Sequence, residues 1–283
     1  EKLAQGAMTV PYRLLALDLD GTLLNDDNSI SERNRAAIWA ARERQVIVTL
    51  STGRMYSSAL QFARELKMVV PLITYNGALI KDTAGRVYQD LPLPLPAART
   101  ALAVAQEYNI HVNLFINDQL YVDRDDIWTE RYRISSAITP KLVPALQHVL
   151  NVEPNKVLLL GEEKELLSAR YVLAEELAGQ AHITSSSPQF VEIIHPSVSK
   201  RSGLAYLLQE FGITPEEAIA IGDNYNDLEM IKFVGLGVAM ANAPAPVRAQ
   251  ADYVTGRNSD DGVAQVIEEF ILSGGKERSE ERR

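Results

Sequence analysis

Short apolar segments alternate along the chain with stretches whose apolar residues repeat at helical spacing. The apolar segments at residues 14–17, 46–50 and 72–75 each end in polar or glycine residues. Their apolar character is continuous rather than alternating, which predicts strands covered on both faces, as in a parallel sheet. A helix is predicted from about Ser31, with Ser29 and Glu32 at the spacing of a capping box. Strands that alternate with helices in this way indicate an α/β fold.

The pattern changes after Asp82. Residues 83–86 predict a hairpin turn, and the proline repeat at 91–96 predicts an extended linker. The segments that follow are predicted as a helix to about residue 108, a hairpin around Asn117 and Asp118, helices at 126–135 and 164–178, and strands at 156–160, 182–185 and 190–195. Antiparallel strands with helices on one face form an α+β layer, so we interpret this stretch as an inserted domain.

Parallel-sheet character returns near the carboxyl end of the chain, at residues 218–223, 236–240 and 252–254. Both ends of the chain therefore build one domain. We predict an α/β core, a parallel sheet with helices on both faces, from residues 1–83 and 196–283. Residues 84–195 are predicted to form the inserted α+β domain. A length of 283 residues suits two domains.

Composition excludes several classes of protein. The chain contains no cysteine, which excludes disulfide frameworks, thiolate metal sites and iron–sulfur clusters. Its net charge of −9 argues against a nucleic-acid partner, and no apolar run approaches the roughly 18 residues of a membrane span. No signal peptide is visible, so we expect a cytoplasmic protein, with Met8 as the natural start and the charged residues after Gly275 as a frayed end.

Four polar clusters lie where predicted strands end or helices begin. The first contains Asp18, Leu19 and Asp20, the second Thr52, Gly53 and Arg54, the third Lys200, and the fourth Asp223, Asn226 and Asp227. The first, second and fourth clusters alone are compatible with ordinary turn or capping chemistry, and Lys200 alone is compatible with a solvated surface charge. The carboxyl ends of strands in an open α/β sheet border the ligand crevice, so together the clusters predict one site.

The carboxylates of this site require a cation. Two carboxylates about 4 Å apart repel each other by about 4 kcal/mol at an effective dielectric constant of 20. A calcium loop after Asp18 is excluded because Leu23 occupies the position that requires glycine. Oxygen ligands without cysteine or histidine favour Mg²⁺. A lysine and a hydroxyl nearby would hold phosphate oxygens, so the constellation indicates phosphoryl transfer.

The four clusters, in this order, resemble the haloacid dehalogenase-like superfamily. The large insertion after Gly53 and the segments at 74–78, 222–230 and 261–264 resemble its Cof-type branch, which has a class IIB cap. The resemblance implies a Rossmann-like core, with Asp18 as nucleophile and Asp20 as general acid and base. It also implies that Asp18, the backbone carbonyl of Asp20 and Asp223 bind Mg²⁺. Thr52, the Gly53 N–H and Asn226 would bind phosphate, and Lys200 would neutralise the charge of the transferring phosphoryl group. Asp227 would orient Lys200 or a metal-bound water. Leu19, Arg54 and Asn76 are further candidates for binding phosphate or substrate.

The resemblance implies an Mg²⁺-dependent phosphatase that acts on small phosphorylated metabolites, mostly sugar phosphates. Cap residues that could face the leaving group are Tyr121, Trp128, Glu192 and His195. A phosphomutase or phosphotransferase would use the same core. A sensor without catalytic activity is disfavoured, because every position that carries chemistry is filled. The sequence does not predict the oligomeric state.

Overall fold

The computed structural model describes residues 12–273. The expected start at Met8 and the expected frayed end after Gly275 lie outside the described residues. Across residues 12–273, no helix combines the length and the apolar character that crossing a membrane requires.

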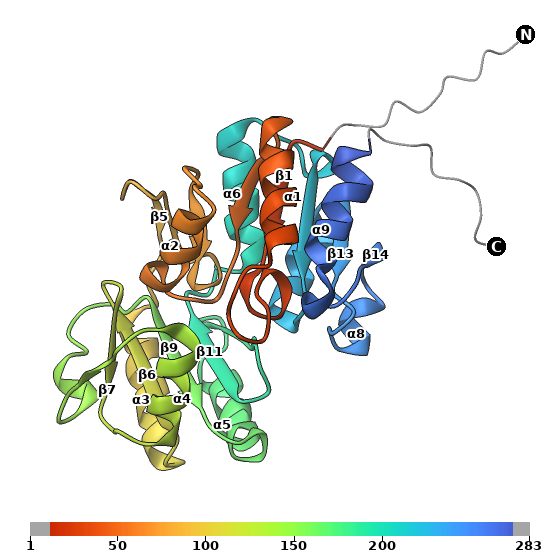
Figure 1. The fold of residues 1–283 in the computed structure, drawn as a ribbon. Helices are drawn as coiled ribbons and strands as arrows, with labels where there is room; N and C mark the ends of the chain where they lie inside the picture. Colours follow the sequence, from red (N-terminus) through yellow and green to blue (C-terminus); the bar gives the residue numbers. More distant parts are fainter. Residues whose placement is uncertain (1–11, 274–283) are drawn as a thin grey trace, which may run out of the picture.

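The core is a five-stranded sheet in the order β14-β13-β12-β1-β2, and every neighbouring pair in it is parallel. Its strands are β1 (Leu14–Leu17), β2 (Ile47–Leu50), β12 (Ala218–Gly222), β13 (Leu236–Ala239) and β14 (Tyr253–Val254). Strands from both ends of the chain therefore lie side by side, with β1 between β2 and β12 (Figure 1). This confirms the predicted parallel-sheet core.

Helices cover both faces of this sheet. On one face, Leu15 and Leu17 belong to the same buried cluster as residues of α1 (Glu32–Glu43), α2 (Tyr56–Glu65) and α9 (Gly262–Ile267). On the other face, Leu14 and Ala16 pack with α6 (Lys200–Phe211) and α7 (Leu228–Phe233). The short helix α8 (Ala245–Arg248) lies near the β14 edge (Figure 1). Burial on both faces explains why the strands are continuously apolar.

The helix predicted near Ser31 begins one residue later and is capped differently. The Ser31 hydroxyl accepts a hydrogen bond from the Asn34 backbone N–H, so Ser31 is the N-cap and the pairing of Ser29 with Glu32 was wrong. The Ser29 hydroxyl instead donates to Asp27. Two serines two residues apart satisfy similar spacing rules, and only the backbone path decides which one caps the helix.

The strand predicted at residues 72–75 joins the parallel sheet only at a bridge between Ser51 and Ile73. It forms β3 (Leu72–Thr74) of a separate antiparallel sheet with β4 (Leu79–Lys81) and β5 (Val87–Asp90). The predicted turn at residues 83–86 connects β4 to β5. The predicted domain boundary at residue 84 therefore falls inside this hairpin, and the chain leaves this layer only after Asp90.

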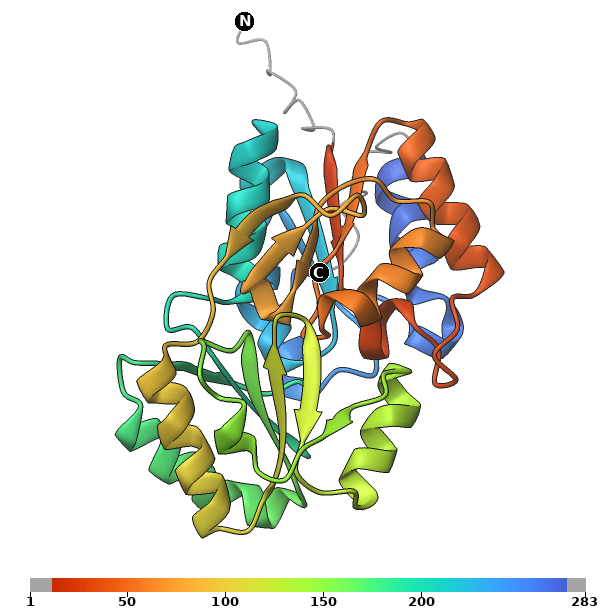
Figure 2. The same ribbon diagram turned by 90° about the vertical axis from the view of Figure 1, so that its left-hand side faces the viewer.

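Residues 95–194 form a second layer around a six-stranded sheet in the order β10-β11-β9-β6-β7-β8. The strands are β6 (His111–Ile116), β7 (Gln119–Val122), β8 (Lys141–Leu142), β9 (Lys156–Leu160), β10 (His182–Thr184) and β11 (Phe190–Ile194), and the helices are α3 (Leu95–Glu107), α4 (Ile127–Ser136) and α5 (Glu163–Glu176). Figure 2 shows this layer, here called the cap, below the core. The predicted proline linker is shorter than expected, because Pro96 lies in the first turn of α3, where proline is tolerated.

The cap sheet is covered on both faces, which corrects the prediction of helices on one face. Leu114 and Leu159 pack in a cluster with α3 and α5 on the outer face. Phe115 and Leu158 belong instead to the cluster that continues into the core. On that inner face, Tyr132 of α4 contacts the Phe115 ring at 6.1 Å. The inner face of the cap is therefore directed at the core.

The tip of the β6–β7 hairpin fastens the cap to the core. Asn117 and Asp118 both have positive φ, as expected for the predicted two-residue turn. The Asp118 carboxylate accepts hydrogen bonds from the backbone N–H groups of Tyr56 and Ser57 at 2.9 Å each, and from the Tyr75 hydroxyl at 2.7 Å. The N-cap residue of α2, Met55, makes no capping hydrogen bond with its own side chain. A residue of the cap thus caps a helix of the core.

We expect Asp118→Ala to lower the free energy of unfolding by about 2 kcal/mol, because the variant loses a helix cap and leaves the buried Tyr75 hydroxyl without an acceptor. Asp118→Asn keeps one acceptor oxygen and should lose about 1 kcal/mol. Urea unfolding measures both values, with Asp125→Ala, at an exposed position nearby in the cap, as the control. Equal stability of Asp118→Ala and Asp125→Ala would contradict this role.

Candidate active site

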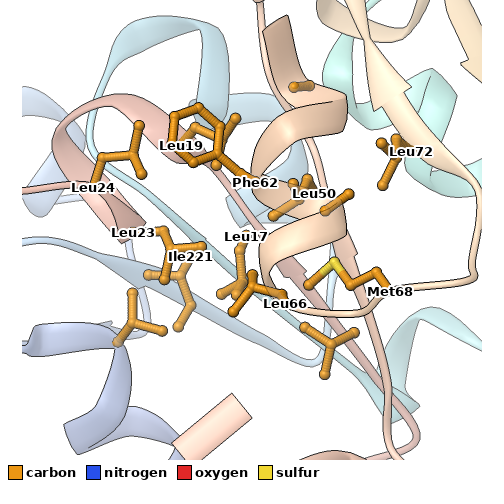
Figure 3. Close-up of a cluster of buried hydrophobic side chains, with 14 of the residues drawn as sticks. Leu17, Leu19, Leu23, Leu24, Leu50, Phe62, Leu66, Met68, Leu72 and Ile221 are labelled. Carbon is orange, nitrogen blue, oxygen red and sulfur yellow. The ribbon is translucent and has the colours of Figure 1, made fainter. Parts of the chain in front are cut away.

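The backbone turn after β1 fixes the first pair of carboxylates. Asp18 follows Leu17, and its N–H donates to the Ile221 carbonyl at 3.0 Å, which anchors it beside β12. Leu19 and Leu23 are buried in an apolar cluster with Leu50, Phe62 and Ile221 (Figure 3). Only the backbone of Leu19 is therefore left to face a ligand. The cluster holds the turn so that Asp18 is buried, while the Asp20 side chain stays 55% exposed.

Gly21 is required by this turn. Its φ is +71°, and a Cβ at this position would lie 2.4 Å from Oδ2 of Asp223. The Thr22 hydroxyl, in the same turn, donates to Oδ1 of Asp223 at 3.0 Å. The turn after β1 and the loop after β12 therefore interlock, and this contact brings Asp223 to Asp18.

Lys200 lies between two carboxylates. Its Nζ is 2.7 Å from Oδ1 of Asp18 and 2.6 Å from Oδ1 of Asp227. Burial opposes the Lys200 ammonium, but the two carboxylates outweigh it and raise the Lys200 pKa above its ordinary value. Lys200 starts α6, whose N-cap is Ser199. The lysine is therefore part of the site and not a solvated surface charge.

Both carboxylate oxygens of Asp227 accept hydrogen bonds from the protein. Its Oδ1 binds Lys200, and its Oδ2 accepts from the backbone N–H groups of Asp223 and Asn224 at 2.9 and 3.0 Å. Asp227 thus binds both the loop that carries Asp223 and the Lys200 ammonium.

Three carboxylates, Asp227 among them, lie close enough together to hold a cation. Carboxylate oxygens of Asp18, Asp223 and Asp227 lie within 4.8 Å of one another. Burial, with the Asp227 charge next, raises the Asp18 pKa well above its usual range and the Asp223 pKa to about 7. Lys200 only partly offsets this repulsion. The donor set is oxygen only, so the residues fit Mg²⁺.

The second predicted cluster follows β2. Thr52 is buried, and its hydroxyl accepts from the Arg54 N–H at 3.1 Å. The Gly53 carbonyl accepts from Lys156 Nζ of the cap at 2.6 Å. A Cβ on Gly53 would lie 3.1 Å from the Asn76 side chain and 3.2 Å from the Glu192 carboxylate, so glycine permits the close approach of the cap.

A buried ion pair of the cap reaches this loop. Lys156 Nζ and Glu192 Oε2 are 2.8 Å apart, with side chains 3% and 1% exposed. The same Glu192 oxygen accepts from Asn76 Nδ2 at 2.8 Å, and Asn76 Oδ1 accepts from Asn226 at 3.1 Å. Burial opposes ionisation of Glu192, but Lys156 outweighs it and lowers the Glu192 pKa. Glu192 is therefore held as a carboxylate.

Core and cap together enclose a cavity of about 190 Å³. Its core side is lined by Asp18, Asp20, Thr52, Gly53, Arg54, Asp223, Asn224 and Asn226. Its cap side is lined by Tyr132, Ser135, Ser136, Lys156, Leu158, Ser186, Ser187, Phe190 and Glu192. Carboxylates at one end and a mixed polar and aromatic wall at the other suit a phosphate ester with a small polar leaving group.

Several predicted residues lie away from this cavity. Lys200 and Asn76 line a smaller neighbouring cavity. Of the four cap candidates, only Glu192 lines the main cavity. Tyr121 packs on the outer face of the cap sheet, Trp128 stacks with Arg131, and His195 accepts from the Ser197 N–H. Lys156 was not predicted from the sequence, although a lysine at the start of an otherwise apolar strand could have indicated it.

Comparison with known proteins gives consistent results. The sequence model of a family described as haloacid dehalogenase-like hydrolase matches residues 15–267. The chain is 33% identical over 271 residues to 5-amino-6-(5-phospho-D-ribitylamino)uracil phosphatase YitU of Bacillus subtilis, covering 93% of this chain and 98% of that protein. A second phosphatase of that name from Bacillus subtilis, YcsE, is 34% identical over 269 residues, covering 93% and 97%.

Solved structures agree with the fold. A haloacid dehalogenase-like hydrolase from Bacteroides thetaiotaomicron superposes with a TM-score of 0.83 at 32% identity, covering 91% of this chain and 98% of the other. The protein TM0651 from Thermotoga maritima gives a TM-score of 0.78 at 33% identity, covering 91% and 97%. The similarity thus extends over both core and cap.

Proposed function

The chain belongs to the Cof-type haloacid dehalogenase-like hydrolases and is a phosphatase of that family. We propose that it hydrolyses small phosphorylated metabolites in the presence of Mg²⁺, and that the reaction passes through an aspartyl-phosphate on Asp18. The observation that carries the proposal is the position of Asp18: it is buried at the end of β1, bonded to Lys200, and lines the cavity together with Asp20 and Thr52.

The reaction proceeds in two balanced steps. In the first step, an oxygen of Asp18 bonds to phosphorus, the bond from phosphorus to the leaving oxygen breaks, and Asp20 gives that oxygen its proton. In the second step, Asp20 takes a proton from a water molecule whose oxygen bonds to phosphorus. The bond to Asp18 then breaks, which releases inorganic phosphate and regenerates the Asp18 carboxylate.

Other residues bind and orient the phosphoryl group. Lys200 supplies a positive charge beside Asp18, and Asp227 keeps it there. Thr52, the Gly53 N–H and Asn226 are proposed to donate to phosphate oxygens, in keeping with their place on the cavity wall. Asp18, Asp223 and the Asp20 backbone carbonyl would hold Mg²⁺. When bound, Mg²⁺ offsets the negative charge of the carboxylates and the phosphate.

The charges that line the cavity favour substrates whose leaving group carries no negative charge in addition to that of the phosphate. Arg54 and Lys156 are the cationic residues that line it within residues 12–273, and each is paired with a carboxylate, Asp20 and Glu192 respectively. The cap wall offers serine hydroxyls and a carboxylate, which suit hydroxyl groups. Two relatives are named for a substrate with a phosphorylated ribityl chain. We therefore propose sugar phosphates or phosphorylated sugar alcohols as substrates.

Phosphate release from a panel of compounds tests the proposal. The panel contains sugar phosphates, nucleotides, pyridoxal phosphate and p-nitrophenyl phosphate, assayed with Mg²⁺, with EDTA and with the Asp18→Asn variant. Glucitol 6-phosphate and 6-phosphogluconate form a matched open-chain pair, with a hydroxymethyl group at C1 in the first and a carboxylate in the second. We expect metal-dependent release that favours the member whose leaving group carries no charge. No release from folded protein would contradict hydrolysis, and transfer to an added acceptor would then indicate a phosphotransferase.

Metal removal should make stability depend on pH. The folded pKa values of Asp18 and Asp223 are raised, so folded metal-free protein binds more protons than unfolded protein above about pH 4. In EDTA, the free energy of unfolding should therefore fall as pH rises from about 4 through about 7, the Asp223 value. Excess Mg²⁺ should restore it by about 3 kcal/mol at 100 times the dissociation constant.

Thermal unfolding at pH 5 and pH 8, with EDTA or Mg²⁺, measures this effect. Asp223→Asn is the matched control, because it removes one of the two groups and should flatten the slope in EDTA. The same slope in wild-type protein and Asp223→Asn would rule out this origin of the pH dependence.

A further inference from the structure

Arg54 binds the Asp20 carboxylate through two nitrogens of its guanidinium group. Arg54 Nε is 2.8 Å from Oδ2 of Asp20, and Nη2 is 2.6 Å from Oδ1. The Arg54 side chain is 7% exposed and stacks over the Phe62 ring at 5.2 Å. Bidentate pairs of this kind fix the orientation of both partners. The guanidinium is therefore committed to Asp20 rather than free to bind substrate.

The Nη2 group of Arg54 has more acceptors than hydrogens. Besides Asp20 Oδ1, it lies 3.1 Å from Oδ1 of Asn28 and 3.1 Å from the Ser135 carbonyl. A guanidinium nitrogen of this type carries two hydrogens, so three acceptors must share them. The contact with Asp20 Oδ1, at 2.6 Å, is the shortest of the three, so the Ser135 carbonyl shares the Nη2 hydrogens without displacing Asp20.

The Ser135 carbonyl, one of the three acceptors of Nη2, belongs to the cap. Ser135 lies in the last turn of α4, where helix carbonyls carry partial negative charge. The neighbouring Ser136 carbonyl accepts from the Ser58 hydroxyl at 3.0 Å, and Ser58 in turn accepts from Arg54 Nη1 at 3.2 Å. The end of α4 thus contacts Arg54 directly and through Ser58. The position of the cap therefore decides how Arg54 divides its hydrogen bonds.

We propose that Arg54 is a positioning residue that couples closure of the cap to proton transfer by Asp20. The inference rests on the proposed function, in which Asp20 is the general acid and base. With the cap docked as it is here, the Ser135 carbonyl binds Nη2 while Arg54 still holds Asp20 through both oxygens, which fixes the orientation from which Asp20 gives a proton to the leaving oxygen. With the cap displaced, Arg54 loses the contacts with Ser135 and through Ser58, and Asp20 is held less firmly.

The test compares two leaving groups. The phenolate of p-nitrophenyl phosphate departs without a proton, whereas a sugar alkoxide requires one. We expect Arg54→Lys, which keeps the charge but not the two-point contact, to lose about 100-fold in kcat/KM on the best sugar phosphate of the panel, because kcat/KM reports the first step and not the second. The loss on p-nitrophenyl phosphate should stay below about 5-fold. KM and inhibition by inorganic phosphate should be unchanged.

Asp20→Asn separates the two hypotheses. If it shows the same selective loss and Arg54→Lys does not, the inference fails while the proposed function stands. If Asp20→Asn loses kcat/KM equally on both substrates, the proposed role of Asp20 as the acid of the first step fails. Its loss in kcat does not discriminate between substrates, because the second step requires Asp20 whatever the leaving group is. A raised KM and weaker phosphate inhibition in Arg54→Lys would overturn the inference in favour of substrate binding.

Ser58→Ala tests the link between Arg54 and the cap. It also provides an independent test if Arg54→Lys does not fold. It removes the contact through Ser58 without touching either member of the ion pair. We expect a smaller loss in kcat/KM that is again selective for the sugar phosphate. Equal effects of Ser58→Ala on both substrates would overturn the coupling to the cap.

Discussion

Asp18→Asn should abolish turnover, with a fall in kcat of at least about 10⁴-fold. The amide cannot attack phosphorus, and the neighbouring carboxylates are held elsewhere: Asp227 by Lys200 and two backbone N–H groups, and Asp223 by Thr22. Rapid-mixing measurements with p-nitrophenyl phosphate should show a burst of p-nitrophenol in Asp20→Asn, which keeps the nucleophile, and none in Asp18→Asn.

The same variant should remain folded. Burial raises the Asp18 pKa, which means that the ionised carboxylate destabilises the metal-free folded state near neutral pH. Asp18→Asn removes this charge, and Lys200 keeps Asp227 as a partner. Its free energy of unfolding in EDTA should therefore equal or exceed that of wild-type protein. Turnover above the background of the double variant D18N/D20N would disprove the nucleophile assignment.

Breaking the ion pair between Lys156 and Glu192 should cost about 3–5 kcal/mol of stability. Both side chains are nearly inaccessible, so Glu192→Gln leaves a buried ammonium without its counter-charge and Lys156→Met leaves a buried carboxylate. The double variant K156M/E192Q removes both charges and should recover most of the loss. Urea unfolding of the wild-type protein, the two single variants and the double variant forms a double-mutant cycle that gives the coupling energy.

The contribution of Glu192 to the free energy of unfolding should change with pH in opposite directions in wild-type protein and in Lys156→Met. In wild-type protein the Glu192 pKa is lowered, so its contribution is present above the unfolded value near 4.3 and is lost as pH falls through the folded value. In Lys156→Met the carboxylate is buried without its partner, so stability should fall as pH rises. Glu268→Gln, at the exposed pair with Arg33, is the control and should change little. Additive losses in the cycle would contradict the pairing.

The core clusters could be predicted from the sequence because they lie at fixed places in an α/β fold. Asp18, Thr52 and Asp223 each follow an apolar strand, and parallel strands bring such positions to one edge of the sheet. That reasoning needs no knowledge of side-chain contacts. It also accounts for Lys200, since the first residue of a helix that packs on the sheet lies near the same edge.

The cap wall could not be predicted in the same way. Lys156 and Glu192 lie in strands whose apolar neighbours conceal them, and their pairing depends on the register of β9 against β11. Tyr121 and Trp128 were plausible candidates by residue type, yet the former faces α3 and α5. Which face of a strand lines a cavity is decided by the packing of one layer on another.

The sequence by itself determined the parallel core, the existence of an inserted layer and the identity of the residues that carry charge. These features follow from local periodicity and from the chemistry of side chains, which act over a few residues. The tertiary structure alone decided that Arg54 is bound to Asp20, that Asp118 of the cap caps α2, and that the Ser135 carbonyl binds Arg54. Such contacts join residues 34 to 81 positions apart. They depend on how the cap docks on the core, because a hydrogen bond requires a particular distance and direction that no local pattern specifies.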